Sequence, residues 1–189
     1  MSLLRASVPF PLRALHLAAF LCVCVFASDS RAQPLVSVET VAIGNPGNAT
    51  DGTTGFGAVS NAFKIGKFEV TIGQYTAFLN AVARTNPNSY IVNLWNGGMM
   101  TNPTVSGIHR TGGGTTPNPY NYASVGNTNQ PVAYVSWFDA ARFANWLHNG
   151  ATNGASTETG AYTLNGATNG VLSKNVNAIW WIPSENEWV

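Results

Sequence analysis

The chain has 189 residues, of which 45% are hydrophobic and 11% aromatic, and its formal net charge is +1. An aromatic content this high argues against a disordered chain. A charge this close to zero argues against a polybasic surface for nucleic acid or anionic lipid. We therefore expect a folded protein that binds neither of these partners by charge alone.

The first 32 residues have the layout of a secretory signal. Arg5 and Arg13 precede the apolar run 14–27, and small residues, Ala32 among them, stand where a signal peptidase would cleave. We predict a signal peptide over residues 1–32, cleavage after Ala32, and a secreted or periplasmic protein. The alternative of a membrane anchor is disfavoured because the apolar run is shorter than the roughly 18 to 20 residues that a span requires.

Both cysteines, Cys22 and Cys24, lie within this predicted signal. Neither follows a small residue, which disfavours a lipoprotein signal. The remaining chain, residues 33–189, has six basic and seven acidic side chains and suits one domain. It has no cysteine for a disulfide, a thiolate metal site or a nucleophile, and we expect no membrane association once the signal is removed.

Two β-rich segments open the mature chain. Residues 35–44 alternate in part and predict a strand, and residues 61–70 predict a second strand in which a bulge at Gly66 turns Phe68 inward. Between them, residues 45–57 are rich in Asn, Pro, Asp and Gly, which favour turns. We expect two strands joined by a long turn.

The segment 71–84 predicts the first helix. Thr71 at the N-cap and Gln74 three residues later form a capping box, and an Asn-Pro pair at 86 and 87 ends the segment. Its apolar stripe consists of Ile72, Tyr75, Phe78, Leu79 and Val82. The three- and four-residue spacing of this stripe is typical of a helix with one buried face.

A second helix is predicted after Ser136. Asp139 stands three residues beyond this cap and in the first turn, where the helix dipole favours negative charge, and Asn149 and Gly150 stop the helix. Its buried stripe is Ala140, Phe143, Ala144 and Leu147. We expect the two helices to pack on the strands through Tyr75, Phe78, Leu79, Phe143 and Leu147.

Long coil separates and follows the helices. Residues 86–130 are rich in Gly, Asn and Pro, but the aromatic side chains in 90–95 and 120–124 favour ordered coil with short strands. The hexapeptide Asn-Gly-Ala-Thr-Asn-Gly occurs at 149–154 and again at 165–170. Since Asn-Gly favours a tight turn, the second copy predicts a hairpin that pairs 161–164 with 171–174.

The last ten residues predict the opening of a helix. Ser184 follows Pro183 as an N-cap, and Glu187 three residues later completes a capping box. About four residues after a cap cannot hold a helix without further chain to pack on. We therefore interpret residues 33–189 as the N-terminal part of a longer domain.

Three segments together resemble one family. Residues 63–80 (FKIGKFEVTIGQYTAFLN), 130–147 (QPVAYVSWFDAARFANWL) and 180–189 (WWIPSENEWV) are similar, in order and spacing, to motifs of the sulfatase-modifying-factor, or formylglycine-generating-enzyme-like, family. The resemblance implies an α+β, C-type-lectin-like fold of short strands, two main helices and long coil. In that family the last motif lies near the middle of the domain, so we expect this fold to be incomplete at its C-terminus.

The resemblance also implies which chemistry belongs to the family. Its oxidases convert a sulfatase cysteine to formylglycine with copper held by two cysteines in the C-terminal half, and its ergothioneine-type members use iron held by histidines of another domain. The family's calcium sites also come mostly from that later part. We expect no cofactor in this chain, and copper, iron or calcium in a full-length relative.

No catalytic or metal-ligating set is predicted in this chain. His109 and His148 stand alone, and an isolated histidine is more often a solvated polar residue than a ligand. Asn45, Asn48 and Asp51 form an oxygen-rich turn that could hold a cation, but one carboxylate is a thin basis for Ca²⁺.

The family-motif residues have sufficient structural interpretations, as helix caps or as large apolar side chains. They are Glu69, Thr71, Tyr75, Pro131, Ser136, Trp137, Asp139, Ala140, Trp146, Pro183, Ser184, Glu185, Glu187 and Trp188. Glu69 is the least ordinary. We expect it to be a partly buried carboxylate near backbone amides, with a structural rather than catalytic role.

Three functions are consistent with this sequence. The first is an exported sulfatase-modifying-factor-like protein that is catalytically incompetent as given. The second is a secreted module that binds a glycan or protein ligand through its long loops. The third is a fragment of a full-length formylglycine-generating oxidase or non-haem iron enzyme.

Overall fold

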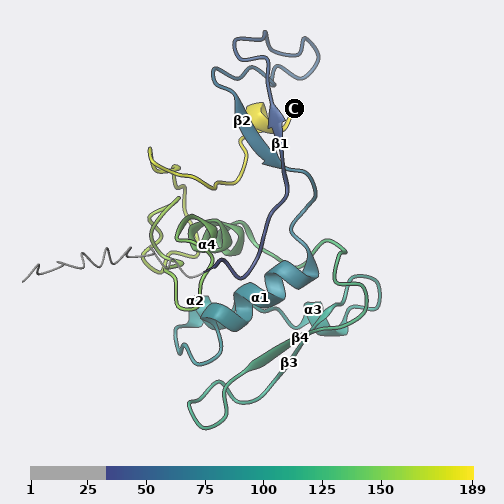
Figure 1. The fold of residues 1–189 in the computed structure, drawn as a ribbon, viewed down its shortest axis with the longest axis vertical. Coiled ribbons are helices and arrows are strands. Elements are labelled where there is room, and N and C mark those ends of the chain that lie inside the picture. The colour runs from purple at the N-terminus through teal and green to yellow at the C-terminus, as the bar shows by residue number, and fades with distance from the viewer. Residues whose placement is uncertain (1–32) are drawn as a thin grey trace, which may run out of the picture. The chain divides into compact units, whose positions relative to one another are not determined.

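The computed structural model describes residues 33–189, and Figure 1 shows their fold. The predicted signal, its cleavage after Ala32, Cys22 and Cys24 lie outside the described residues. Within the described part, no helix is both long and apolar enough to cross a membrane. Short strands and helices are mixed along the chain, which confirms the α+β class.

Among residues 33–189, the first two strands form a sheet of two strands. β1 (Thr40–Ile43) runs antiparallel to β2 (Phe63–Gly66), with Thr40 opposite Gly66. The pairing is shorter than the sequence predicts, and there is no bulge that turns Phe68 inward: the ladder ends at Gly66, and Phe68 is 63% exposed. A Cβ at Gly66 would lie 3.1 Å from the carbonyl oxygen of Phe68, so the chain turns tightly there and leaves the ladder.

Both predicted helices are confirmed with their caps. α1 (Ile72–Val82) begins with a capping box in which the Gln74 amide donates to Thr71 Oγ1 and the Thr71 amide donates to Gln74 Oε1. α4 (Trp137–His148) begins with the same arrangement of Ser136 and Asp139. In each case two backbone N–H groups that the first turn leaves free are satisfied locally.

The core is an aromatic cluster between α1 and α4. The Phe78 ring centroid lies 5.3 Å from that of Phe143 and 5.3 Å from that of Trp146, and Tyr75 lies 6.0 Å from Phe143. The predicted core residues Tyr75, Phe78, Leu79 and Phe143 are buried, and Leu147 packs against them while partly exposed. The two helices therefore pack on each other. The expectation that both also pack on the first two strands is wrong: of the two, only the first helix packs closely on a strand of the described region, the one at residues 121–124.

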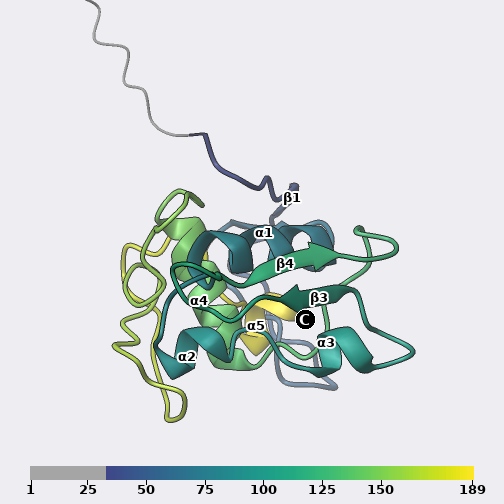
Figure 2. The ribbon, with the colours of Figure 1, turned by 90° about the horizontal axis from the view of Figure 1, so that it is seen from below.

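The strand that packs on α1 comes from the middle of the chain. β3 (Ile108–Thr111) and β4 (Asn121–Ser124) form an antiparallel hairpin, and Figure 2 shows β4 running beside α1. The Asn80 side chain of α1 donates to the Tyr122 carbonyl and accepts from the Tyr122 amide. The expected short strands are thus present between residues 86 and 130.

Two short helices in this middle segment were not predicted. α2 (Ser89–Val92) and α3 (Gly98–Thr101) each have four residues, too few to show a periodic pattern. They are held by contacts with distant residues: the Tyr75 hydroxyl donates to the Leu94 carbonyl beyond α2, and the Tyr134 ring packs directly on Gly98. Tertiary contacts, rather than propensity, stabilise these turns.

The prediction of a hairpin around the second hexapeptide, residues 165–170, is wrong. Neither 161–164 nor 171–174 is a strand, and Val171 is 99% exposed. The buried side chain of Asn145 accepts from the Tyr162 amide and donates to the Tyr162 carbonyl, so the backbone groups that Tyr162 would contribute to a ladder are already bonded. The segment is an irregular coil wrapped on α4.

Candidate functional site

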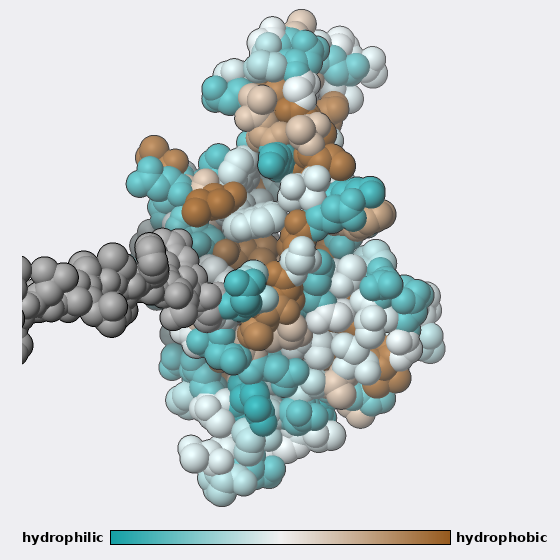
Figure 3. Space-filling model, viewed as in Figure 1, coloured by the Kyte–Doolittle hydropathy of each residue, from teal (hydrophilic) through white to brown (hydrophobic). Residues whose placement is uncertain are grey.

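One hollow of the described region is an apolar cleft. It has a volume of about 770 Å³ and lies between β2 with the residues that follow it, α4, and the segment 179–183. Figure 3 shows apolar surface gathered on this face below the loop that joins β1 and β2. We refer to this hollow as the apolar cleft.

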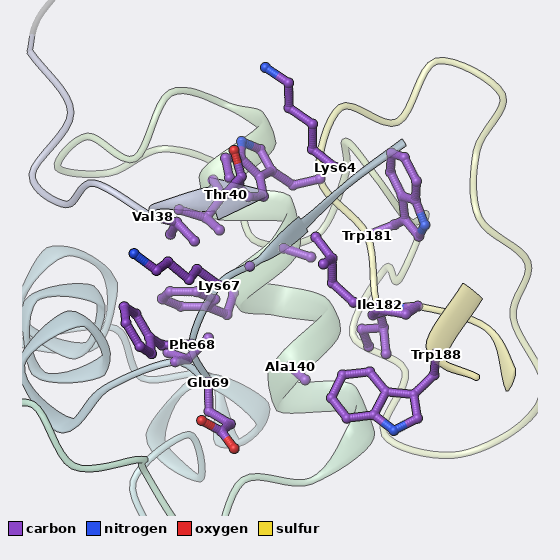
Figure 4. Close-up of a pocket in the computed structure, with 18 of the residues that line it drawn as sticks. Val38, Thr40, Lys64, Lys67, Phe68, Glu69, Ala140, Trp181, Ile182 and Trp188 are labelled. Carbon is purple, nitrogen blue, oxygen red and sulfur yellow. The ribbon is translucent and has the colours of Figure 1, made fainter. Parts of the chain in front are cut away.

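The lining is mostly aliphatic and aromatic. Its principal apolar side chains are Val38, Phe63, Ile65, Phe68, Val135, Phe143, Leu147, Ile179, Trp180, Trp181, Ile182 and Trp188. The charged residues among the lining are Lys64, Lys67 and Glu69, and Figure 4 shows the charged ends of the two lysines pointing away from Ala140 and Ile182. Lys67 Nζ lies 2.7 Å from Glu39 Oε1, in an exposed ion pair.

Hydrogen bonds hold the wall formed by residues 179–183. The Ile179 amide donates to His148 Nδ1 at 3.1 Å, and the Ile182 amide donates to the Tyr162 hydroxyl at 3.0 Å. Burial raises the pKa of the Tyr162 hydroxyl, so this group is neutral at physiological pH. The wall is therefore attached to α4 and to the coil that follows α4.

The helix next to this wall is α5 (Glu185–Trp188), and it has the predicted cap. The Glu187 amide donates to Ser184 Oγ, and the Ser184 amide donates to Glu187 Oε2. The Trp181 indole also donates to the Glu187 carboxylate, and the Gly57 amide donates to Asn186 Oδ1 at 3.1 Å. Figure 1 shows α5 beside the β1–β2 hairpin.

The Glu187 carboxyl carries a shifted pKa. Partial burial opposes its ionisation, but hydrogen bonds from the Ser184 amide and hydroxyl and from the Trp181 indole, together with the positive charge of Lys174, outweigh burial. The pKa is therefore lowered from the usual 4.5. The ionised carboxylate is the form that ties the cap to the cleft wall.

The predicted motif residues fall into two groups. Glu69, Tyr75, Ala140, Pro183 and Trp188 line the apolar cleft, so it brings together residues from all three family motifs. Cap positions are occupied by Thr71, Ser136, Asp139, Ser184 and Glu187. The first group contributes to the lining of the cleft, and the second caps the helices.

The other motif residues have separate positions. Trp146 is fully buried, and its indole donates to the Thr152 carbonyl. Pro131 forms an isolated bridge with Thr71, which joins the second motif to the start of α1. Trp137 is 41% exposed and stacks edge-on against Tyr162, and Glu185 is exposed in the first turn of α5.

The exposure of Glu69 differs from the sequence-based prediction. It is exposed rather than partly buried, and it lies at the rim of the cleft. The backbone amide of Thr71 is satisfied by Gln74, so the start of α1 does not need the Glu69 carboxylate. The capping box thus fills the role that the sequence suggested for Glu69.

The polar residues considered for metals lie apart. His109 is on β3, whereas His148 ends α4 and accepts from Ile179. Asn48 is used inside its own loop, where it donates to the Gly57 carbonyl and accepts from the Val59 amide. Among residues 33–189, no group of three or more His, Cys, Asp or Glu side chains is placed to hold a metal ion.

Asp51, the carboxylate of that turn, is engaged by its own backbone. The amides of Thr53 and Thr54 donate to Asp51 Oδ1 at 2.9 and 2.8 Å. These bonds, with the Thr54 amide contributing most, lower the pKa of the Asp51 carboxyl. This carboxylate organises a turn.

Sequence reasoning missed Arg142, which is 1% exposed although it is charged. Its guanidinium donates from Nε to Glu158 Oε1 at 2.8 Å and from Nη2 to Glu158 Oε2 at 3.2 Å, and it also donates to the Ala167 carbonyl. The sequence offered one signal. Arg142 stands between Ala141 and Phe143, both buried, on a helix with an otherwise apolar face.

These observations define a mixed α+β domain in which residues of all three motifs line one apolar cleft. The family model described as sulfatase-modifying factor enzyme 1-like domain matches residues 32–189. The chain therefore belongs to this family, as the three motifs indicated. Neither the search of curated proteins nor the search of solved structures gave a match.

Proposed function

We propose that this is an exported sulfatase-modifying-factor-like protein whose residues 33–189 bind an apolar segment of a partner chain and do not by themselves carry out oxidation. The observation that supports the proposal is the convergence of all three motifs on one cleft with an apolar lining. A cleft with few polar groups is typical of a binding site. General acid–base work would instead need titratable groups paired within it.

The aromatic wall supplies the binding energy in this proposal. Trp180, Trp181 and Trp188 line the cleft, and Trp188 is 70% exposed. Covering such side chains removes apolar surface from water at about 25 cal/mol per Å². Aromatic side chains are also the residue type most often dominant in protein interfaces.

Tryptophan fluorescence tests the binding role. Peptides with apolar side chains are expected to shift the emission of the cleft tryptophans, and glycine-serine peptides of equal length are not. Ile179→Asp places a charge on a cleft residue that is 67% exposed, and it is expected to weaken binding about tenfold or more. Val176→Asp is the matched control, since Val176 is fully exposed and lies outside the lining. Equal binding by the two variants contradicts the proposal.

Catalytic incompetence has its own assay. The purified protein, supplied with copper and a cysteine-containing sulfatase peptide, is expected to give no formylglycine. Conversion above the protein-free blank overturns this part of the proposal and leaves the binding role untouched.

A glycan ligand is the second candidate. Exposed Trp137 and Tyr134, at 41% and 44% exposure, offer ring faces on which a sugar could stack, and the resemblance implies a C-type-lectin-like frame. A glycan array in which the protein binds no sugar removes this candidate.

The third candidate is a longer oxidase or non-haem iron enzyme of which these residues form the N-terminal part. Sequencing of the genomic region beyond codon 189 tests it. A continuation with neither a cysteine pair nor a histidine cluster ends this candidate.

A further inference from the structure

The chain contains several Asn-Gly pairs, in which the asparagine side chain can react with the backbone that follows it. There are five, at Asn96, Asn149, Asn153, Asn165 and Asn169. In such a pair the backbone nitrogen of glycine can attack the asparagine side-chain amide, because glycine adds no side chain to hinder the approach. All five asparagines are exposed, so exposure does not distinguish them.

Local sequence does not distinguish four of them either. Asn149 and Asn153 belong to the first Asn-Gly-Ala-Thr-Asn-Gly copy, and Asn165 and Asn169 occupy the same positions in the second. Any difference in reactivity between equivalent positions must therefore come mainly from the tertiary structure around each copy.

Three of these four pairs are held by hydrogen bonds. The Asn149 side chain donates to the carbonyls of Ser156 and Thr159 at 2.9 and 2.7 Å. The amide of Gly154 donates to the Ala81 carbonyl at 3.2 Å. The amide of Gly166 donates to Glu158 Oε2 at 2.7 Å.

The pair at Asn96 is held too, because its side-chain oxygen accepts from the Gly98 amide at 2.8 Å. The pair Asn169–Gly170 differs from the other four. Neither the Asn169 side chain nor the Gly170 amide makes a hydrogen bond to any residue that the structure describes. A Cβ built on Gly170 would meet nothing within 4 Å, so the chain is unobstructed there.

We infer that Asn169 is the site at which this protein deamidates spontaneously. The Gly170 nitrogen loses its proton and attacks Cγ of Asn169, and the side-chain nitrogen leaves as ammonia. Water then opens the resulting succinimide at either carbonyl, which gives aspartate or isoaspartate. No oxidant or reductant takes part in this reaction.

The modification changes the surface of the coil on α4. It adds one carboxylate to a chain with six basic and seven acidic residues after residue 32, so the formal charge of that part changes from −1 to −2. The isoaspartate product also lengthens the backbone by one methylene between Thr168 and Gly170. Ala167, whose carbonyl accepts from the buried Arg142, is only two residues away.

Peptide mapping tests the inference on the purified, folded protein. Trypsin cleaves after Arg142 and Lys174, so a single peptide, 143–174, carries all four repeat asparagines. After incubation at mildly alkaline pH, fragment ions locate the mass increase caused by replacing NH₂ with OH. Conversion at Asn169 is expected to be about three- to tenfold faster than at Asn149, Asn153 or Asn165, since those pairs must first break a hydrogen bond.

The same incubation in concentrated urea is the control. Unfolding removes the hydrogen bonds, so the four rates are expected to converge, and Asn169→Gln is expected to lose the fast component in the folded protein. Two results overturn the inference. One is a folded-state rate at Asn149, Asn153 or Asn165 equal to that at Asn169, and the other is a preference for Asn169 that persists unchanged in urea.

Discussion

At the scale of single residues, burial and hydrogen bonding decide what a side chain does more than its type. Arg142 and Lys67 are both cations paired with a glutamate, yet the Arg142 side chain is 1% exposed and the Lys67 side chain is 45% exposed. The Arg142 pair also orders the coil after α4, because Glu158 accepts from the Gly166 amide as well. The Lys67–Glu39 pair is exposed to solvent, where the electrostatic attraction between two charged side chains contributes little to stability.

These two cations give the first prediction. Arg142→Met leaves the partly buried Glu158 carboxylate without its partner and is expected to lower the free energy of unfolding by about 3 kcal/mol. Lys67→Met, at an exposed pair, is expected to cost less than about 1 kcal/mol. Urea denaturation followed by circular dichroism measures both, and similar losses in the two variants would contradict the prediction.

At the scale of elements, capping boxes recur where the three motifs begin their helices. α1, α4 and α5 start at Thr71, Ser136 and Ser184, and in each the third helical residue bonds back to the cap. The device acts within four residues, so it does not depend on what the helix packs against. This independence is why the sequence identified all three starts.

The cap of α4 supports a second prediction. Ser136→Ala removes the acceptor of the Asp139 amide and is expected to destabilise the protein by about 1 kcal/mol. Ser136→Asn keeps an acceptor at this position and is expected to restore most of the loss. Thermal unfolding curves of the two variants distinguish a capping effect from a general intolerance of substitution at Ser136.

The cap of α5 supports a third prediction, on pH. Because the folded state lowers the pKa of the Glu187 carboxyl below its usual 4.5, ionised Glu187 stabilises the folded arrangement above that pH. This stabilisation is lost as the pH falls below about 4.5 and through the lowered pKa. Emission of Trp181, whose indole donates to this carboxylate, is expected to change over that range.

Glu187→Gln provides the comparison. The variant cannot ionise at this position, so its fluorescence is expected to lack the Glu187 transition over the same acidic range. An unchanged acidic transition in the variant would assign the effect to another carboxyl group.

At the scale of the whole described region, the α1–α4 core holds the molecule together and the cleft lies beside it. Phe78 is fully buried among Tyr75, Phe143 and Trp146, whereas Trp188 at the cleft is 70% exposed. The core and the cleft share Phe143, which faces both. Binding in the cleft is therefore expected to be sensitive to core packing.

Phe78→Ala is the fourth prediction. Removal of this ring leaves a cavity in the core and is expected to lower the free energy of unfolding by about 4 kcal/mol. Trp188→Ala is expected to change it by no more than about 0.5 kcal/mol, because the side chain is mostly exposed. Chemical denaturation measures both, and a Trp188→Ala loss as large as that of Phe78→Ala would place Trp188 in the core.

Much of the fold was predictable from the sequence, and the site was less so. Periodic apolar residues gave α1 and α4, and the same residues, Tyr75, Phe78, Leu79 and Phe143, form the core. The sequence did not predict the cleft. Five of the residues that line it were nevertheless singled out from the sequence as family-motif residues. Its third wall contains Trp180 and Trp181, whose positions depend on His148 and Tyr162, distant in sequence.

The sequence by itself determined the family, the helix starts and the principal core residues, because each depends on side chains a few positions apart. The tertiary structure decided where β2 ends, that residues 161–174 form coil, and that Glu69 is exposed. It also decided which of the four repeat asparagines lies in an Asn-Gly pair that makes no restraining hydrogen bond to the described residues. The physical reason is that a backbone group can make only a few hydrogen bonds, and distant partners such as Asn145 compete for them with the local pattern.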